Sequence, residues 1–338
     1  MEKYETLFTG GLLEPTDVEK MAAKGIVVSI ARPDLDESEL ASLLSGKDAY
    51  ILGGVEHVTA RVLEHADQLK VIAFLGVGYH AFIDTPAATR RGIAVTNAPG
   101  ANSRAVAEFA IGLMLDAWRR ITYLTDATKA GRWEEDKRQN LYGKTLGVVG
   151  LGNIGSIVAR IASHGFGMRV VYSGPRSKPA AERDLGAVRL PLDELLAQSD
   201  VVTLHAPYGP ETEGMLDAQR LARIKPGAVI VNTSESELID ATALRNALLS
   251  GRVRAVAMDG YYVEPTPAPE DDKLGLLALP HDRVLVTPHT ANATAESFQA
   301  MLQANVDAIV NVLGTGRDQR VVNPEFRQHA QWIGQDER

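Results

Sequence analysis

The chain has 338 residues, of which 45% are hydrophobic and 23% charged, a composition typical of a globular protein that is long enough for two domains. Its formal net charge of −8 argues against a nucleic-acid-binding protein, because binding a polyanion requires a basic face. The chain contains no cysteine, which excludes disulfides, thiolate nucleophiles and cysteine-ligated zinc, and we expect no metal site.

The first hundred residues have an α/β rhythm. Residues 1–24 lack the basic start and apolar stretch of a secretory signal, and no apolar run of the chain is long enough to cross a membrane, so we expect a cytoplasmic protein. Short apolar segments separated by helical patterns then predict a first α/β domain. Its predicted strands are Ile26–Ile30, Ala49–Leu52, Val71–Leu75 and Ala94–Asn97.

Residues 103–129 have the pattern of one long helix. Val106, Phe109 and Leu113 recur at three-to-four spacing, and no proline interrupts the segment. Such a helix can link two domains and can also bury a face against a second subunit. We therefore expect a homodimer that uses the helix after Ser103.

The region after Lys144 alternates apolar strands with helical segments, which predicts a doubly wound parallel sheet. The predicted strands are Leu146–Val149, Arg169–Tyr172, Val201–Leu204, Ala228–Asn232, Ala255–Met258 and Val284–Thr287. A last amphipathic helix is predicted over Ala293–Leu313, before a polar tail. The predicted fold class is α/β, with two Rossmann-like domains.

The first strand of this region leads into a Gly-x-Gly-x-x-Gly turn and then a helical pattern. Gly150 permits the tight turn, Gly152 lets the backbone approach a pyrophosphate, and Gly155 allows the helix to pack closely on the strand. Asn153 and Ile154 open the helix, whose free N–H groups face the phosphates. The turn therefore predicts a bound dinucleotide.

Several motifs together closely resemble the D-isomer-specific 2-hydroxyacid dehydrogenases, a family that includes phosphoglycerate, glyoxylate and formate dehydrogenases. The resemblance runs from about Tyr50 to Pro324. The motifs are Gly76-Val77-Gly78, Val106-Ala107-Glu108, the glycine turn, Asp259 with Glu264-Pro265, and Thr287-Pro288-His289.

The resemblance implies a domain organisation and an activity. A dinucleotide-binding domain, residues 102–289, is expected to be inserted into a substrate domain formed by residues 1–101 and 290–338, with a cleft between them. The family is typically dimeric. Its members use NAD or NADP to transfer a hydride between the nicotinamide and a carbonyl or hydroxyl carbon.

The resemblance also assigns the proton transfer. It implies that His289 donates a proton to the substrate carbonyl and that Glu264 is its carboxylate partner. The physical chemistry agrees, because hydride addition creates an alkoxide that a nearby imidazolium stabilises, and a carboxylate favours and orients the imidazolium. In the oxidising direction the neutral imidazole acts as the base.

Other family positions imply contacts to substrate and cofactor. The backbone amides of Gly76, Val77 and Gly78 are expected to receive the substrate carboxylate, although the following Tyr79–Asp84 departs from the family form and is one residue longer. Asp259 is expected to hold the nicotinamide carboxamide, and His205 to brace the cofactor site. The remaining expected cofactor contacts are Val106, Ala206, Pro207, Thr212, Thr233, Ser234 and His289 itself.

One departure from the family concerns the substrate pocket. Where the family reads Asn-Thr-Ala-Arg-Gly, with an arginine that grips the substrate carboxylate, this chain reads Asn232-Thr233-Ser234-Glu235-Ser236. The catalytic set is thus Glu235, Glu264 and His289. An ordinary 2-oxo acid is expected to bind and react poorly, because a negative group replaces a positive one.

Three explanations of this exchange remain open. Glu235 recognises a substrate with an amine, hydroxyl or other donor in place of the carboxylate; or another arginine, Arg104 or Arg32, supplies the anion clamp for an ordinary 2-oxo acid; or the chain has become a catalytically weak or inactive protein that senses the dinucleotide. The retained His289 and Glu264 favour an enzyme.

The segment after the second strand of the cofactor domain bears on the choice between NAD and NADP. NAD users of the family carry an aspartate where this chain has Gly174, so no carboxylate is present to repel a 2′-phosphate. Ser173, Arg176, Ser177 and Lys178 supply the positive charge and hydroxyl groups that a phosphate requires. We therefore predict a preference for NADP, with NAD as the alternative.

Overall fold

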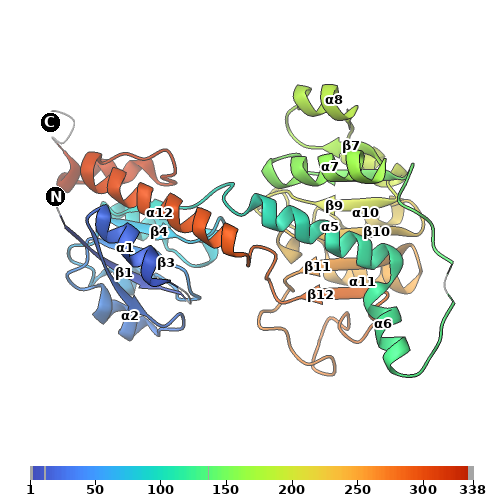
Figure 1. Ribbon diagram of the computed structural model, residues 1–338, viewed down its shortest axis with the longest axis horizontal. Coiled ribbons are helices and arrows are strands. Elements are labelled where there is room, and N and C mark those ends of the chain that lie inside the picture. Colours follow the sequence, from blue (N-terminus) through green and yellow to red (C-terminus); the bar gives the residue numbers. More distant parts are fainter. Residues whose placement is uncertain (1–2, 11–12, 136, 334–338) are drawn as a thin grey trace. The chain divides into compact units, whose positions relative to one another are not determined.

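The computed structural model describes residues 3–10, 13–135 and 137–333. The chain divides into two compact units (Figure 1). We call Met1–Asn102 with Thr294–Arg338 the discontinuous unit, and Ser103–Ala293 the inserted unit, because it interrupts the chain of the other. Each unit is built on a parallel sheet, which confirms the predicted α/β fold class.

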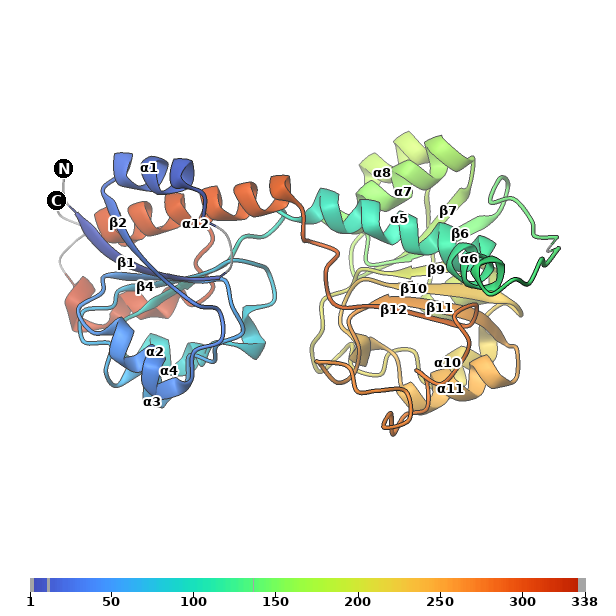
Figure 2. The ribbon, with the colours of Figure 1, turned by 60° about the horizontal axis from the view of Figure 1, so that its bottom comes forward.

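The discontinuous unit contains a five-stranded sheet in the order β2-β1-β3-β4-β5. Its core lies on both faces of the sheet: Met21 and Ile309 pack with Phe8 on one face, and Leu40 and Val62 lie in the cluster on the other. Helices α1 and α12 thus cover one face, and α2, α3 and α4 the other (Figure 2). The elements are β1 (Tyr4–Thr9), α1 (Pro15–Ala23), β2 (Ile26–Ala31), α2 (Glu37–Leu44), β3 (Ala49–Leu52), α3 (Ala60–Leu63), β4 (Val71–Phe74), α4 (Thr85–Arg90), β5 (Ala94–Thr96) and α12 (Ala295–Thr315).

The inserted unit contains a seven-stranded sheet in the order β12-β11-β10-β9-β6-β7-β8. Helices α5 and α7 contribute to the core cluster on one face, and α9, α10 and α11 to the cluster on the other. Its helices are α5 (Ser103–Arg119), α6 (Ile121–Lys129), α7 (Asn153–Phe166), α8 (Pro179–Leu185), α9 (Leu192–Gln198), α10 (Ala218–Arg223) and α11 (Ala241–Leu249). Its strands are β6 (Thr145–Val149), β7 (Arg169–Ser173), β8 (Val188–Arg189), β9 (Val201–Leu204), β10 (Ala228–Asn232), β11 (Val253–Asp259) and β12 (Val284–Thr287).

The strand order of the inserted unit reverses between β6 and β9, which are neighbours in the sheet although β7 and β8 separate them in the chain. Ligands of open α/β sheets bind beyond the carboxyl ends of the strands at such a reversal. The glycine turn follows β6 and His205 follows β9, so both lie at this point. The topology therefore places the predicted dinucleotide motif where a ligand is expected.

The prediction of one long helix over residues 103–129 is wrong in one respect, because in the structure this helix is interrupted at Arg120. Arg120 adopts a left-handed conformation with φ 57°, which separates α5 from α6. The Asp116 carboxylate accepts a hydrogen bond from the amide of Thr122 at 2.8 Å and thereby caps the start of α6. The apolar face of α5 packs within its own unit, against α7 and strands β10 and β11.

The chain after α12 is more structured than a polar tail. Phe326 and Trp332 are buried in the discontinuous unit, and their rings meet edge to face at 5.2 Å. Within the part of the chain that the structure describes, no helix combines the length and the apolar character that a membrane crossing requires.

Candidate active site

The three glycines of the turn after β6 differ in the space around them. Gly150 has φ 92°, and a Cβ placed there would lie 2.6 Å from the carbonyl oxygen of His205. A Cβ on Gly155 would lie 2.3 Å from the carbonyl oxygen of Gly150, so the helix can approach the strand only without a side chain. A Cβ on Gly152, the N-cap of α7, would meet no atom within 4 Å. The amino end of α7 therefore faces open space, as a site for a pyrophosphate requires.

This difference predicts opposite outcomes for two alanine substitutions. Gly152→Ala is expected to change the free energy of unfolding by about 1 kcal/mol at most and to weaken dinucleotide binding about tenfold, because the methyl group enters the space of the pyrophosphate. Gly155→Ala is expected to destabilise the fold by about 1–3 kcal/mol, because the methyl group overlaps backbone. Urea unfolding and calorimetric titration measure both quantities. Unchanged affinity in Gly152→Ala would contradict the assignment.

His205 links the ends of two neighbouring strands. Its Nε2 lies 2.9 Å from the hydroxyl of Thr203, and its Nδ1 lies 3.4 Å from the hydroxyl of Thr233. Burial lowers the pKa of His205 to about 3, so the ring is neutral at physiological pH. These contacts support a bracing role, since they engage both ring nitrogens and the neutral ring has no positive charge to place beside a developing alkoxide.

The turn after β10 is fixed by Asn232, which is fully buried. Its amide nitrogen donates to the carbonyl oxygen of Glu235 at 3.0 Å, and its amide oxygen accepts from the backbone N–H of Ser234 at 3.0 Å. The hydroxyl of Ser234 donates to the carbonyl oxygen of Leu204 at 3.3 Å. Asn232 therefore sets the position of Glu235, a role that its place at the end of an apolar strand did not reveal.

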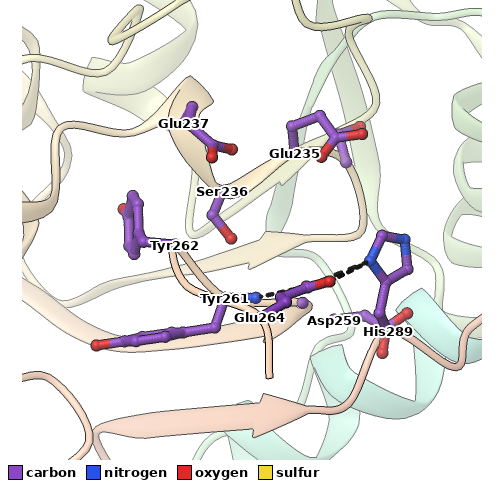
Figure 3. A pocket seen from close by; sticks show the side chains of 10 residues that line it. Glu235, Ser236, Glu237, Asp259, Tyr261, Tyr262, Glu264 and His289 are labelled. Carbon is purple, nitrogen blue, oxygen red and sulfur yellow. Dashed lines mark hydrogen bonds and ion pairs between the residues drawn. The ribbon is translucent and has the colours of Figure 1, made fainter. Parts of the chain in front are cut away.

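A pocket opens beyond the carboxyl ends of β10, β11 and β12 (Figure 3). It brings together Glu235, Glu264 and His289, which the sequence predicted as one catalytic set. Among the described residues, four carboxylate side chains but no lysine or arginine line it, so His289 is the one potential cation of this described lining. The lining residues are Ser234–Glu237, Asp259, Gly260, Tyr261, Tyr262, Glu264 and His289.

His289 follows β12 in a left-handed conformation with φ 53°. Its Nδ1 lies 3.2 Å and 3.3 Å from the two carboxylate oxygens of Glu264. Glu264 also accepts the backbone N–H of Tyr261 at 3.0 Å, which fixes the carboxylate (Figure 3). Because Nδ1 is held by Glu264, Nε2 is the ring nitrogen that is left to exchange a proton with a substrate.

Asp259 lies at the end of β11 and is 5% exposed. Its carboxylate accepts the hydroxyl of Thr287 at 2.6 Å and the backbone amides of Thr290 and Ala291 at 2.9 Å and 2.6 Å. These three bonds flank His289 on both sides and hold the turn that carries it. A carboxylate has about four acceptor positions, so little of its capacity remains for a carboxamide.

The carboxylate of Glu235 and the ring of His289 face the same pocket (Figure 3). Glu235 is exposed as a whole, but partial desolvation of its carboxylate in the pocket is the largest cause of its raised pKa; His289 opposes the rise, and the negative charges of Glu237 and Glu264 add to it. Glu235 therefore takes up a proton at higher pH than an ordinary glutamate. Within the described ranges its side chain accepts no hydrogen bond from the protein.

Of the two arginines predicted as substitute clamps, Arg104 belongs to the same unit as this pocket and is not among its lining residues. Arg104, in the first turn of α5, pairs with Glu108, and its side chain is 72% exposed. Arg32 belongs to the discontinuous unit, where it pairs with Asp34 and Glu39.

The side chains of Thr212, Tyr261 and Tyr262, which lie near these sites, form hydrogen bonds within the protein. The hydroxyl of Thr212 closes the turn after β9 by donating to the carbonyl oxygen of Pro207 at 2.7 Å. The hydroxyls of Tyr261 and Tyr262 donate to Asp272 and to the carbonyl oxygen of Ile239. Val106 is buried on α5, and Ala206 is buried after β9.

The loop after β4 turns its carbonyl groups inward. The oxygen of Gly76 accepts the backbone N–H of Ala98 at 2.8 Å, and the oxygen of Val77 accepts the side-chain amide of Asn97 at 3.0 Å. The backbone amides of Val77 and Gly78 donate to no acceptor in the described part of the protein. Such a run of free amides can bind an anion.

The loop after β7 carries the residues predicted to select the cofactor. Arg176 and Ser177 are exposed, and the backbone N–H of Lys178 donates to the hydroxyl of Tyr172 at 2.8 Å. Arg189, which the sequence did not single out, donates to the carbonyl oxygens of Gly174 and Pro175 in the same loop. Only the folded chain brings this arginine to the loop.

A protein-family model matches most of the inserted unit. The model of the D-isomer specific 2-hydroxyacid dehydrogenase NAD binding domain matches residues 111–291. This part of the chain is therefore a domain for a nicotinamide dinucleotide.

Individual relatives cover both units. D-3-phosphoglycerate dehydrogenase from Mycobacterium tuberculosis (strain ATCC 25618 / H37Rv) is 39% identical over 288 residues, which are 84% of this chain and 52% of that protein. The chain thus spans about half the length of the phosphoglycerate dehydrogenases that it matches. Hydroxypyruvate reductase from Thermotoga maritima is 37% identical over 290 residues, which are 85% of this chain and 92% of that protein.

Solved structures have the same fold. A putative D-isomer specific 2-hydroxyacid dehydrogenase from Polaromonas superposes with a TM-score of 0.81 and 31% identity, over 95% of this chain and 99% of that one. The apo structure of D-lactate dehydrogenase from Escherichia coli superposes with a TM-score of 0.79 and 30% identity, over 94% and 99%.

Proposed function

The chain belongs to the D-isomer specific 2-hydroxyacid dehydrogenase family, as its motifs predicted, and from this premise we propose that it is an NAD(P)-dependent oxidoreductase. It transfers a hydride between the nicotinamide and a carbonyl or hydroxyl carbon. The observation that carries the proposal is the pair of His289 and Glu264, at 3.2 Å, in the same unit as the glycine turn.

The residues of the glycine turn and of the pocket fit a nicotinamide dinucleotide, and each group has a separate role. Gly152 leaves open space at the start of α7, while Gly150 and Gly155 allow the turn and the close approach of the helix that create it. A nicotinamide dinucleotide held there would supply or accept the hydride. Nε2 of His289 gives a proton to the oxygen that becomes the alkoxide, and Glu264 stabilises the imidazolium before the transfer. In the oxidising direction the neutral ring takes the proton back.

We propose that the substrate carries a hydrogen-bond donor, such as an ammonium or hydroxyl group, where the family's usual substrates carry a carboxylate. The support is the position of Glu235 in a pocket whose lining, in the described part of the chain, has three further carboxylates and no arginine or lysine. The arginines predicted as a replacement clamp are each engaged by a carboxylate of their own unit, Arg104 by Glu108 and Arg32 by Glu39. No observation favours a dinucleotide sensor without catalysis.

Turnover tests the proposed function. The protein, incubated with NADPH and a panel of 2-oxo acids, aldehydes, ketones and imines, is expected to oxidise the cofactor with at least one member, followed by the loss of nicotinamide absorbance. Calorimetry on the same sample measures cofactor binding independently. Tight cofactor binding without turnover on any member, or on any alcohol with NADP, would favour the dinucleotide sensor instead.

We propose that the cofactor is NADP rather than NAD. The support is Gly174, which leaves no acid at the usual NAD-selecting position, together with the cations Arg176 and Lys178, for which the described residues include no carboxylate partner. Comparing the Kd of both cofactors tests the choice, and NAD bound more tightly than NADP would refute it.

We also propose a homodimer. The support is the exposed apolar side chains of α6 and of the segment after it, which follow the break at Arg120. Ile121, Trp133 and Tyr142 are exposed there by 52%, 87% and 80%, as an apolar contact surface would be. Sedimentation velocity of the protein and of Trp133→Glu tests this, and a monomeric wild-type protein would refute it.

A further inference from the structure

Arg189 holds the loop that follows β7 by its backbone. Its guanidinium donates to the carbonyl oxygen of Gly174 through Nε at 3.1 Å and through Nη2 at 2.8 Å, and to that of Pro175 at 3.0 Å. Arg189 comes from the short edge strand β8, where it lies opposite Tyr172 of β7. The contact therefore joins the end of one strand pair to the first residues of the loop.

The other end of the loop is also fixed. The hydroxyl of Tyr172 accepts the backbone N–H of Lys178 at 2.8 Å and donates to the carboxylate of Glu182, on α8, at 2.5 Å. Helix α8 lies at the edge of the sheet next to β7 (Figure 1). Gly174 to Lys178 is thus held at both ends, and Arg176 and Ser177 between them remain exposed.

The charge of Arg189 is not neutralised by its contacts. Its partners are neutral carbonyl groups, and no carboxylate of the described residues forms an ion pair with it. Three cationic side chains, Arg176, Lys178 and Arg189, therefore belong to or contact one short loop. Glu182, whose carboxylate reaches the loop, is engaged by Tyr172 and by the amide of Lys178.

We propose that Arg189 is a specificity-determining residue for the 2′-phosphate of the cofactor, an inference that rests on the proposed preference for NADP. It acts in two ways. It turns the carbonyl oxygens of Gly174 and Pro175 toward itself, and so away from the phosphate that they would repel, and it adds a positive charge beside Arg176. Because NAD lacks this phosphate, the effect is specific to NADP.

Two nucleotide fragments without nicotinamide test the proposal without any turnover. The Kd values of 2′,5′-ADP and of ADP are measured by calorimetry for the wild-type protein, Arg189→Leu, Arg189→Lys and the control Arg183→Leu. Arg183 lies on α8, pairs with Asp184 and makes no bond to the loop, so its variant loses one positive charge nearby but keeps the contact under test.

The wild-type protein is expected to bind 2′,5′-ADP more tightly than ADP. Arg189→Leu should weaken 2′,5′-ADP about tenfold or more and ADP less than about threefold, because the two carbonyl groups are no longer held away from the phosphate and a positive charge near it is lost. Arg189→Lys should lie in between, since an ammonium keeps the charge but cannot bridge two carbonyl groups as a guanidinium does. Arg183→Leu should leave the ratio of the two Kd values unchanged.

Each of the remaining outcomes contradicts either the role of Arg189 or the preference for NADP. If the wild-type protein prefers 2′,5′-ADP and both Arg189 variants keep its ratio, or lose both ligands equally, the role of Arg189 is wrong while the NADP preference stands. If the wild-type protein prefers ADP, the NADP preference itself is wrong, and the role of Arg189 is wrong with it. If Arg189→Leu does not fold, the ratio in Arg189→Lys decides.

Discussion

Replacing His289 by asparagine is expected to lower kcat by about 10²–10⁴-fold while the Kd of the cofactor changes little, because the variant loses the proton donor but keeps the pocket. Asparagine is suited to the test, since it tolerates the left-handed backbone that His289 adopts at φ 53° and can still donate to Glu264. Alanine would add backbone strain to the loss of the proton donor.

Two companion variants separate chemistry from structure. Glu264→Gln keeps an oxygen that accepts the amide of Tyr261 but removes the negative charge beside the imidazole, so kcat is expected to fall by a smaller factor, about 10–10². His281→Asn, a change at an exposed histidine paired with Asp126, is expected to leave kcat unchanged. Full activity of His289→Asn would show that the proton comes from another group.

Replacing Glu235 by arginine is expected to raise kcat/KM for a small 2-oxo acid such as glyoxylate by about 10²-fold or more. The gain combines a restored anion donor, about 2.7–4 kcal/mol, with removal of a repulsion of about 4 kcal/mol between like charges 4 Å apart at an effective dielectric near 20. The turn should keep its shape, because Asn232 binds the backbone of residue 235 and not its side chain.

Matched variants show whether the effect belongs to this position. Glu237→Arg makes the same change of charge two residues away in the pocket lining and is expected to have a clearly smaller effect. Glu235→Gln removes the repulsion without adding a donor, so it should gain only part of the activity. If Glu235→Arg and Glu237→Arg gave equal gains, the effect would be one of overall charge.

The raised pKa of Glu235 adds a pH dependence to the same experiment. As the pH falls, the carboxylate takes up its proton earlier than an ordinary glutamate, so its repulsion of an anionic substrate fades over a pH range that lies above the usual range of a glutamate. The ratio of kcat/KM for glyoxylate to that for the neutral glycolaldehyde should rise in this range. Glu235→Gln keeps His289, and any loss of the rise in this variant assigns it to Glu235.

Most strands could be predicted because their environment is simple. Residues 201–204 and 228–232 are buried on both faces of the sheet, so their sequences are mostly apolar, with Thr203 and Asn232 as the polar exceptions. β1 was missed because Thr6 and Thr9 are polar yet fully buried, and β8 because two residues carry no periodic pattern. The break at Arg120 has no glycine or proline to mark it and depends on the side chain of Asp116.

The candidate site was predictable where a residue's chemistry follows from its own motif. His289 and Glu264 meet as the family resemblance implied, and the glycine turn has the spacing that a pyrophosphate requires. Asn232 and Arg189 could not be identified in this way. Their roles arise from hydrogen bonds to backbone carbonyl groups, which any sequence supplies, and only the fold determines which carbonyl groups lie within reach.

The most direct test of the account compares two small aldehydes of opposite charge, glyoxylate and aminoacetaldehyde, as substrates with NADPH. The wild-type protein is expected to show the higher kcat/KM with the ammonium-bearing aldehyde, and Glu235→Arg should reverse the order, because the sign of residue 235 decides which charge the pocket accepts. A wild-type protein that reduces glyoxylate more efficiently than aminoacetaldehyde at neutral pH would contradict it.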